Sequence, residues 1–242
     1  LVLIMVVIGT RCTEEFLTPK PLSFYAPENT YVDANGLNAA LIACLANTRN
    51  EYYGNMSPFV SEQIFSDVAN CGTTDKTGVH MDLPAQMLPD ESMIRGDNTQ
   101  LGRYWTTNGY NRIQYANVVI SRIDVAEWKS DEERNNILGK AYFHRANVYY
   151  RMVHQYGDVP LVLEEIKEPK LDFYTCTRES ILRKCKKDLE FAAQWVSASG
   201  PVGDIDKAAV NHLLTKVNLS LGEFDDAIAS ANAIISDGVH KL

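Results

Sequence analysis

The stretch LGKAYFHRANVYYRMVHQYGDVPLV, residues 138–162, decides the fold class. Its apolar and aromatic residues recur at steps of three and four, namely Leu138, Ala141, Tyr142, Val148, Tyr149, Met152, Val153 and Tyr156. This spacing stacks side chains on one face of a helix. Gly157 can adopt a left-handed cap and Pro160 cannot continue a helix, so the helix is predicted to end there. Such a helix needs a partner helix, which favours an array of helix pairs over a sheet enzyme.

Further helices are predicted on both sides of this stretch. Asp33 is a good N-cap for a helix that runs to about Thr48, and helical periodicity resumes between residues 101 and 123. Residues 130–133 form a capping box, in which the Ser130 hydroxyl and the Glu133 carboxylate satisfy each other's backbone donors at the start of the central helix.

The last third of the chain adds more helices. Thr177 is predicted to cap a helix that runs through Val196. One helix of a final pair is lined by Val210, Leu213, Leu214, Val217 and Leu221, and the other by Ala227, Ile228, Ala231, Ile234 and Ile235. Phe224 is expected to fill the corner between them. The residues Leu214, Gly222, Phe224 and Ala227 fit the 34-residue tetratricopeptide pattern. The predicted fold class is therefore all-α, a tetratricopeptide-like scaffold of helix pairs with long irregular ligand-binding loops.

The first residues have a different composition. Residues 1–8, LVLIMVVI, are too short to span a bilayer, which takes about 20 apolar residues, and fit the core of a truncated secretory signal. A buried helix start is the alternative. Cys12 follows directly and is the natural candidate for lipid attachment, whereas the spacing of the five cysteines matches no zinc or redox motif. We assign residues 1–12 to a lipoprotein signal, 13–32 to an extended proline-rich tether and 33–242 to a helical domain.

Charge and motifs exclude several classes of function. A net charge of −8 argues against binding to the phosphate backbone of nucleic acids. No phosphate loop, dinucleotide fingerprint, zinc-protease or nucleophile-elbow motif is present in the sequence. His144 and His154 are ten residues apart and are expected on a polar flank of the helix rather than in a metal site. We predict no catalytic residue, metal ligand or cofactor, and the sequence leaves a bound calcium open.

Residues 54–100 form the longest irregular stretch, and such loops often carry function. Here and at its borders, flat aromatic rings mix with hydrogen-bonding groups, in Tyr52, Tyr53, Asp67, Asn70, Thr73, Asp75, Arg95, Asp97, Asn98, Tyr104 and Trp105. That mixture suits sugars, whose apolar faces stack on rings while their hydroxyls bind polar groups. The alternative is an ordinary polar loop whose aromatic residues anchor it to the helices. Trp105 and Tyr110 are expected in the core.

Five segments together resemble the SusD/RagB family. They are CTEEFL (12–17), ANVVISRI (116–123), KAYFHRANVYYRMVHQYGDVPLV (140–162), DLEFAAQW (188–195) and AAVNHLLTKVNLSLGEFDDAIASANAII (208–235). The most specific element is YGDVPLV after an arginine-containing helix. The resemblance covers nearly the whole chain, which would correspond to the first half of a family member.

The resemblance implies an outer-membrane, surface-exposed lipoprotein that captures glycans, or in some cases peptides, and sits on a TonB-dependent transporter barrel. Cys12 would carry the lipid, with Glu14–Glu15 as a surface-export signal, although Arg11 stands where a small residue is usual. The ligand site would draw on residues 66–104, and its expected contacts are Asp67, Asn70, Asp75, Arg95, Asn98 and Tyr104. Neither catalysis nor nucleic-acid binding is implied.

Three functions compete at this point. The first is capture of oligosaccharides and their delivery to the transporter, with a peptide-binding member of the same uptake system as a variant. The second is a tetratricopeptide-type scaffold whose only partner is another protein. The third is a glycosidase, which would need two carboxylates a few ångströms apart in a cleft.

Overall fold

The structure is a computed structural model and describes residues 27–52, 66 and 109–239 of the 242-residue chain. Its helices are α2 (Pro27–Thr30), α3 (Ala34–Tyr52), α8 (Asn111–Arg122), the short 3-10 helix η3 (Ile123–Val125), α9 (Asp131–Tyr156), α10 (Arg178–Trp195), α11 (Lys207–Leu221) and α12 (Phe224–Ile235). Two short strands, β1 (Val159–Pro160) and β2 (Thr175–Cys176), pair antiparallel with Val159 opposite Cys176. The predicted all-α fold class is confirmed, and the strand pair is an addition to it.

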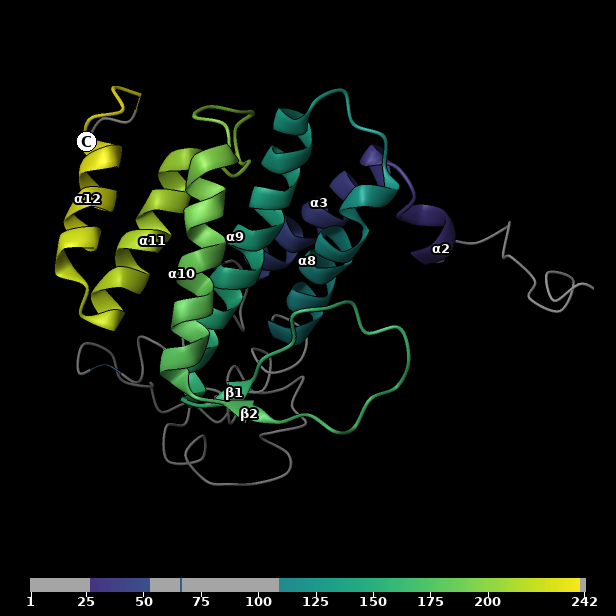
Figure 1. Cartoon of the computed structure of the whole chain (residues 1–242), viewed down its shortest axis with the longest axis horizontal. Coiled ribbons are helices and arrows are strands. Elements are labelled where there is room, and N and C mark those ends of the chain that lie inside the picture. Colours follow the sequence, from purple (N-terminus) through teal and green to yellow (C-terminus); the bar gives the residue numbers. More distant parts are fainter. Residues whose placement is uncertain (1–26, 53–65, 67–108, 240–242) are drawn as a thin grey trace, which may run out of the picture.

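The helices stack in chain order. Helices α9, α10, α11 and α12 each pack on the next, while α3 and α8 pack together beside α9 (Figure 1). The larger apolar core lies between α8, α9, α10 and α11, and a second one joins α3, α8 and the first half of α9. Gly139 permits a close approach of α9 to the end of α10, because a Cβ atom there would lie 2.9 Å from Val196 Cγ2 and 3.2 Å from Ala192 Cα. Helices packed side by side are the arrangement that the sequence periodicity predicts. Among α9 to α12, only α11 and α12 are joined by a tight turn, whereas residues 157–177 separate α9 from α10.

Local signals fix most helix starts. The Asp33 carboxylate accepts from Gly36 N at 2.8 Å, the Ser130 hydroxyl from Glu133 N at 3.2 Å and the Thr177 hydroxyl from Ser180 N at 3.3 Å, so the predicted N-caps are confirmed. The other half of the predicted capping box is different, since the Glu133 carboxylate accepts from Lys129 N at 2.9 Å and not from Ser130. Its side chain reaches one residue further back.

Two glycines end helices in different ways. Gly222 closes α11 in the left-handed conformation, with φ 75° and ψ 15°. Gly157 also has a positive φ of 78°, but its ψ of −123° is not that of a left-handed cap. The chain therefore leaves α9 extended, directly into β1. Helix α3 continues to Tyr52, beyond the predicted end at Thr48, because no breaker intervenes.

Two further predictions are wrong in part. Residues 27–30, assigned to an extended tether, form the helical turn α2. Phe224 does not fill the corner of the last helix pair but is 64% exposed, and Ile228 and Ile235 are exposed as well. The reason is that α12 packs on α11 through Ala227 and Ser230, and its other face has no neighbour among the described helices.

In the described part of the chain, no helix combines the length and apolar character needed to cross a membrane.

Candidate functional site

The residues predicted to bind ligand, Asp67, Asn70, Asp75, Arg95, Asn98 and Tyr104, lie outside the described residues, as does Cys12. The structure does describe the end of the helix stack to which that stretch connects, because residues 109 and 110 form a turn that opens into α8. Tyr110, expected in the core, is half-buried and packs against the larger apolar cluster.

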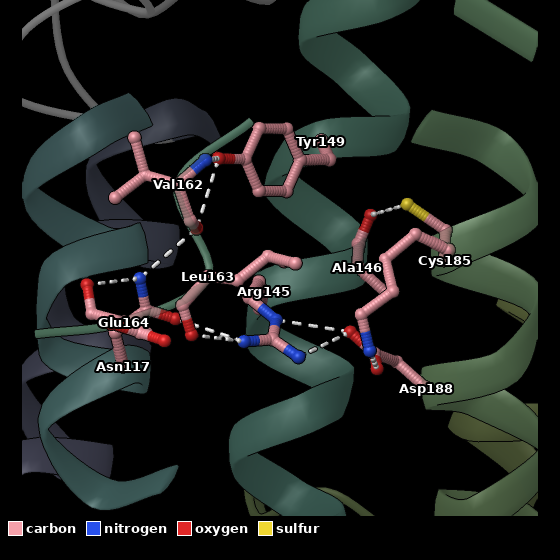
Figure 2. A network of polar contacts seen from close by, with 10 residues as sticks. Asn117, Arg145, Ala146, Tyr149, Val162, Leu163, Glu164, Cys185 and Asp188 are labelled. Atoms are coloured by element: carbon pink, nitrogen blue, oxygen red, sulfur yellow. Dashed lines mark hydrogen bonds and ion pairs between the residues drawn. The ribbon is translucent and has the colours of Figure 1, made fainter. Parts of the chain in front are cut away.

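Along α8 and the middle of α9, side chains hold the backbone of residues 162–166, which we call the clamped segment. The Tyr149 hydroxyl accepts from Val162 N at 2.6 Å and donates to Val162 O at 3.2 Å. The Asn117 amide donates to the carbonyls of Val162 and Glu164, both at 3.1 Å (Figure 2). These side chains satisfy backbone groups that a sheet would otherwise pair.

Arg145 lies at the centre of this arrangement and is 3% exposed. Its guanidinium donates at 3.0 Å to Leu163 O and to Asn117 Oδ1, and it binds Asp188 Oδ2 through Nε at 3.0 Å and Nη2 at 2.8 Å (Figure 2). Lys184 contacts the other oxygen of Asp188. The buried positive charge is thus neutralised by α10, while its remaining donor holds the clamped segment.

The rest of the clamped segment is bound in the same way. The Gln114 amide donates to Ile166 O at 2.9 Å and accepts from Ile166 N at 3.1 Å, so it pairs with that residue as a strand would. Arg122 forms a two-pronged ion pair with Glu165, at 2.8 and 2.6 Å. Helices α8 and α9 therefore hold five consecutive residues without regular secondary structure, and α10 contributes indirectly by binding Arg145 through Asp188.

A hollow of about 440 Å³ opens beside the clamped segment, within the range of about 300–1,000 Å³ that is typical of ligand pockets. It is lined by Tyr110, Asn111, Ile113, Gln114, Pro160, Val162, Ile166 and Phe173. The Tyr110 hydroxyl donates to Pro160 O at 2.8 Å, and burial raises the pKa of this phenol. Two aromatic rings and aliphatic carbon dominate this surface, which suits contact with an apolar ligand face.

Three titratable side chains of the helix stack, Cys44, His144 and Cys185, are buried. Burial raises the pKa of the Cys44 thiol to about 12 and raises that of Cys185 as well, so both remain protonated at neutral pH. His144, expected on a polar flank, is in fact fully buried, and burial lowers its pKa to about 3. Across residues 27–52, 66 and 109–239, no three His, Cys, Asp or Glu side chains converge as metal ligands would.

Sequence reasoning missed Arg145, Asn117 and Gln114. The available signal was an arginine in the middle of an apolar helix that precedes YGDVPLV, since a buried charge requires a partner. Its partner, Asp188, is 43 residues further along the chain.

Residues 31–219 match a SusD-like family that is described as starch-binding and associating with the outer membrane. The chain belongs to this family. The SusD-like protein P2 of Formosa agariphila is 25% identical over an alignment 245 positions long, which covers 98% of this chain and 45% of that protein. A second SusD-like protein of the same organism, P25, is 23% identical, and the chain covers 46% of it. The chain thus spans about half the length of these SusD-like relatives.

Solved structures share the SusD-like fold. A laminarin-binding SusD-like protein superposes with a TM-score of 0.71 at 19% identity, covering 84% of this chain and 44% of that one. Surface glycan-binding protein A of Bacteroides uniformis superposes with a TM-score of 0.70 at 18% identity, covering 86% of this chain and 47% of that one. Because the sequence identities are only 18–19%, the similarity to these structures establishes the fold alone.

Proposed function

We propose that the chain belongs to a cell-surface lipoprotein that captures oligosaccharides and delivers them to a TonB-dependent transporter in the outer membrane. The observation that carries the proposal is the match to a starch-binding, outer-membrane-associated family over residues 31–219. The binding of laminarin by one structural neighbour gives it further support. In this proposal Cys12 carries the lipid anchor, and no bond of the glycan is made or broken.

The hollow beside the clamped segment supports a binding role by its chemistry. Its amide and phenol groups are largely occupied, because Gln114 pairs with Ile166 and Tyr110 donates to Pro160. It therefore offers ring and aliphatic surface on which the apolar face of a sugar can stack, with Phe173 as the more accessible ring. The hydrogen bonds to sugar hydroxyls would come from the predicted contacts Asp67, Asn70, Asp75, Arg95, Asn98 and Tyr104.

In this proposal the clamped segment raises affinity because it is held in place before the ligand binds. A surface held in place before the ligand arrives loses little conformational freedom when the ligand binds, so more of the interaction energy appears as affinity. The backbone of residues 162–166 is held in this way by buried or half-buried side chains. Affinity for an oligosaccharide should still be modest, because stacking and a few hydrogen bonds are all that contribute.

Isothermal titration calorimetry with oligosaccharides from laminarin and from starch, and with a mixed peptide pool, tests the proposal. We expect binding of at least one glycan and no release of reducing sugar. Phe173→Ala should weaken that binding roughly threefold to tenfold, the worth of one aromatic stacking contact. Phe224→Ala, which removes an exposed ring from α12, is the control and should leave it unchanged. Binding of peptides alone, or hydrolysis of any glycan, contradicts the proposal.

A further inference from the structure

Asp188 of α10 lies outside the hollow but is bonded to its wall through other side chains. Among the described residues that line the hollow, none belongs to α10, whereas the clamped segment supplies Val162. Asp188 is buried and binds Arg145 of α9, whose guanidinium reaches the clamped segment (Figure 2). We use the term relay for the side chains of Lys184, Asp188, Arg145 and Asn117.

Each bond of the relay fixes the orientation of the next side chain. Asp188 Oδ2 accepts from both Nε and Nη2 of Arg145, at 3.0 and 2.8 Å, so this edge of the guanidinium faces α10. The remaining nitrogen, Nη1, donates at 3.0 Å to Leu163 O and to Asn117 Oδ1. A guanidinium is planar and rigid, so its two sides cannot turn independently. Lys184 contacts Asp188 Oδ1 and thereby holds the carboxylate itself.

The last bonds of the relay depend on the donor character of Arg145. A guanidinium donates hydrogen bonds and accepts none, so it selects the oxygen end of the Asn117 amide. The nitrogen end is thereby directed to the clamped segment, where it donates to Val162 O and Glu164 O, both at 3.1 Å. A reversed amide would instead place its oxygen against these two carbonyl oxygens, which cannot donate to it. The position of Val162 in the wall of the hollow thus depends on a carboxylate of a different helix.

We propose that Asp188 is a positioning residue for glycan binding, which holds the wall of the hollow in its binding conformation through the relay. Its effect on affinity rests on the proposed function. That effect should be moderate, because the side chains of Tyr149 and Gln114 bind the clamped segment independently of the relay. Loss of the Asp188 charge therefore loosens the middle of the clamped segment without releasing its ends.

Hydrogen-exchange mass spectrometry of the free protein tests the relay without a ligand. Asp188→Asn keeps the size of the side chain but removes its charge, and its amide nitrogen, a donor, then faces Lys184 or Arg145. Peptides that cover residues 160–167 should exchange about twofold to tenfold faster than in the wild type, the range that the net worth of one hydrogen bond gives. Gly139→Ala is the control, because it crowds α9 against the end of α10 and leaves the relay side chains in place. It should leave exchange at residues 160–167 unchanged.

Calorimetry with the oligosaccharide identified by the titrations above measures the effect on affinity. Asp188→Asn should raise Kd roughly threefold to tenfold, the cost of ordering about one side chain when the ligand binds. Gly139→Ala should bind as the wild type does.

The double variant Arg145→Met, Asp188→Leu separates positioning from stability. It leaves neither partner of the buried pair charged, so in urea it should be more stable than Asp188→Leu alone. No guanidinium then reaches Leu163 O or Asn117 Oδ1, so its Kd should stay raised roughly threefold to tenfold. A merely structural role of Asp188 predicts instead that affinity recovers together with stability.

The two measurements distinguish the positioning role from the proposed function. Unchanged exchange at residues 160–167 in Asp188→Asn, equal effects from Gly139→Ala, or wild-type affinity in the double variant would overturn the positioning role. A wild-type protein that binds no glycan would contradict the proposed function, and the exchange measurement then decides by itself whether Asp188 holds the wall of the hollow.

Discussion

Removal of the Arg145 guanidinium should destabilise the fold strongly and locally. Arg145→Met deletes four hydrogen bonds, two to Asp188 and one each to Asn117 and Leu163, and leaves the Asp188 carboxylate buried. Breaking a buried ion pair from one side costs about 3–5 kcal/mol. The cost should fall at the lower end of that range, because the partly exposed Lys184 stays beside Asp188. With a total stability of about 5–15 kcal/mol for a typical domain, the variant should still fold.

Urea denaturation followed by far-UV circular dichroism gives the free energy of unfolding. Arg134→Met is the matched control, because its ion pair with Asp124 is exposed and should contribute less than about 1 kcal/mol. Asp188→Leu should also be costly by itself, but the double variant Arg145→Met, Asp188→Leu should lose less than the sum of the two, since apolar replacement of both partners leaves no buried charge. Additivity within about 0.5 kcal/mol, or equal costs for Arg145→Met and Arg134→Met, would refute the reasoning.

Two further predictions concern His144 and Gly139. The folded pKa of His144, about 3, lies below its ordinary value of 6.5, so between these values the unfolded chain takes up a proton that the folded chain does not. This group should therefore lower the free energy of unfolding by up to about 1.4 kcal/mol for each unit by which the pH falls. In urea titrations at pH 7, 5.5 and 4, the free energy of unfolding of His144→Leu should depend less on pH than that of the wild type. Parallel pH dependences of the two proteins would contradict this. Gly139→Ala should lower the free energy of unfolding by about 1–3 kcal/mol, because the added Cβ meets Val196. Gly200→Ala is the control and should lower it far less in the same assay, because no neighbouring atom lies nearer than 3.7 Å. Equal losses in the two variants would exclude a tight packing of α9 against the end of α10.

Features encoded within a few residues could be predicted from the sequence. The caps at Ser130 and Thr177 bond to residues three positions away, so their signal is local. The central helix and its end before Pro160 follow from apolar spacing and from the missing proline N–H in the same way. The family resemblance, carried by five such segments, is likewise confirmed by the match over residues 31–219.

Features that depend on distant partners could not be predicted. In the sequence, His144 falls outside the apolar face of its helix and is therefore predicted on a polar flank. The packing of α9 against its neighbouring helices buries it completely. Phe224 and Ile228 have the spacing of core residues, yet no described helix covers their side of α12. The pairing of Arg145 with Asp188 joins two helices and cannot be read from either one. The predicted ligand contacts from Asp67 to Tyr104 remain predictions, because they fall outside the described residues.

The central claim is that α8 and α9, with Arg145 neutralised by α10, hold a recognition surface beside the start of α8. Hydrogen-exchange mass spectrometry tests it most directly, with and without a saturating oligosaccharide identified by calorimetry. The account predicts slow exchange at residues 162–166 in the free protein and added protection on binding in peptides that cover residues 109–114 and 160–173, with α11 and α12 unchanged. Fast exchange at residues 162–166 in the free protein, or added protection confined to α11 and α12, would contradict it.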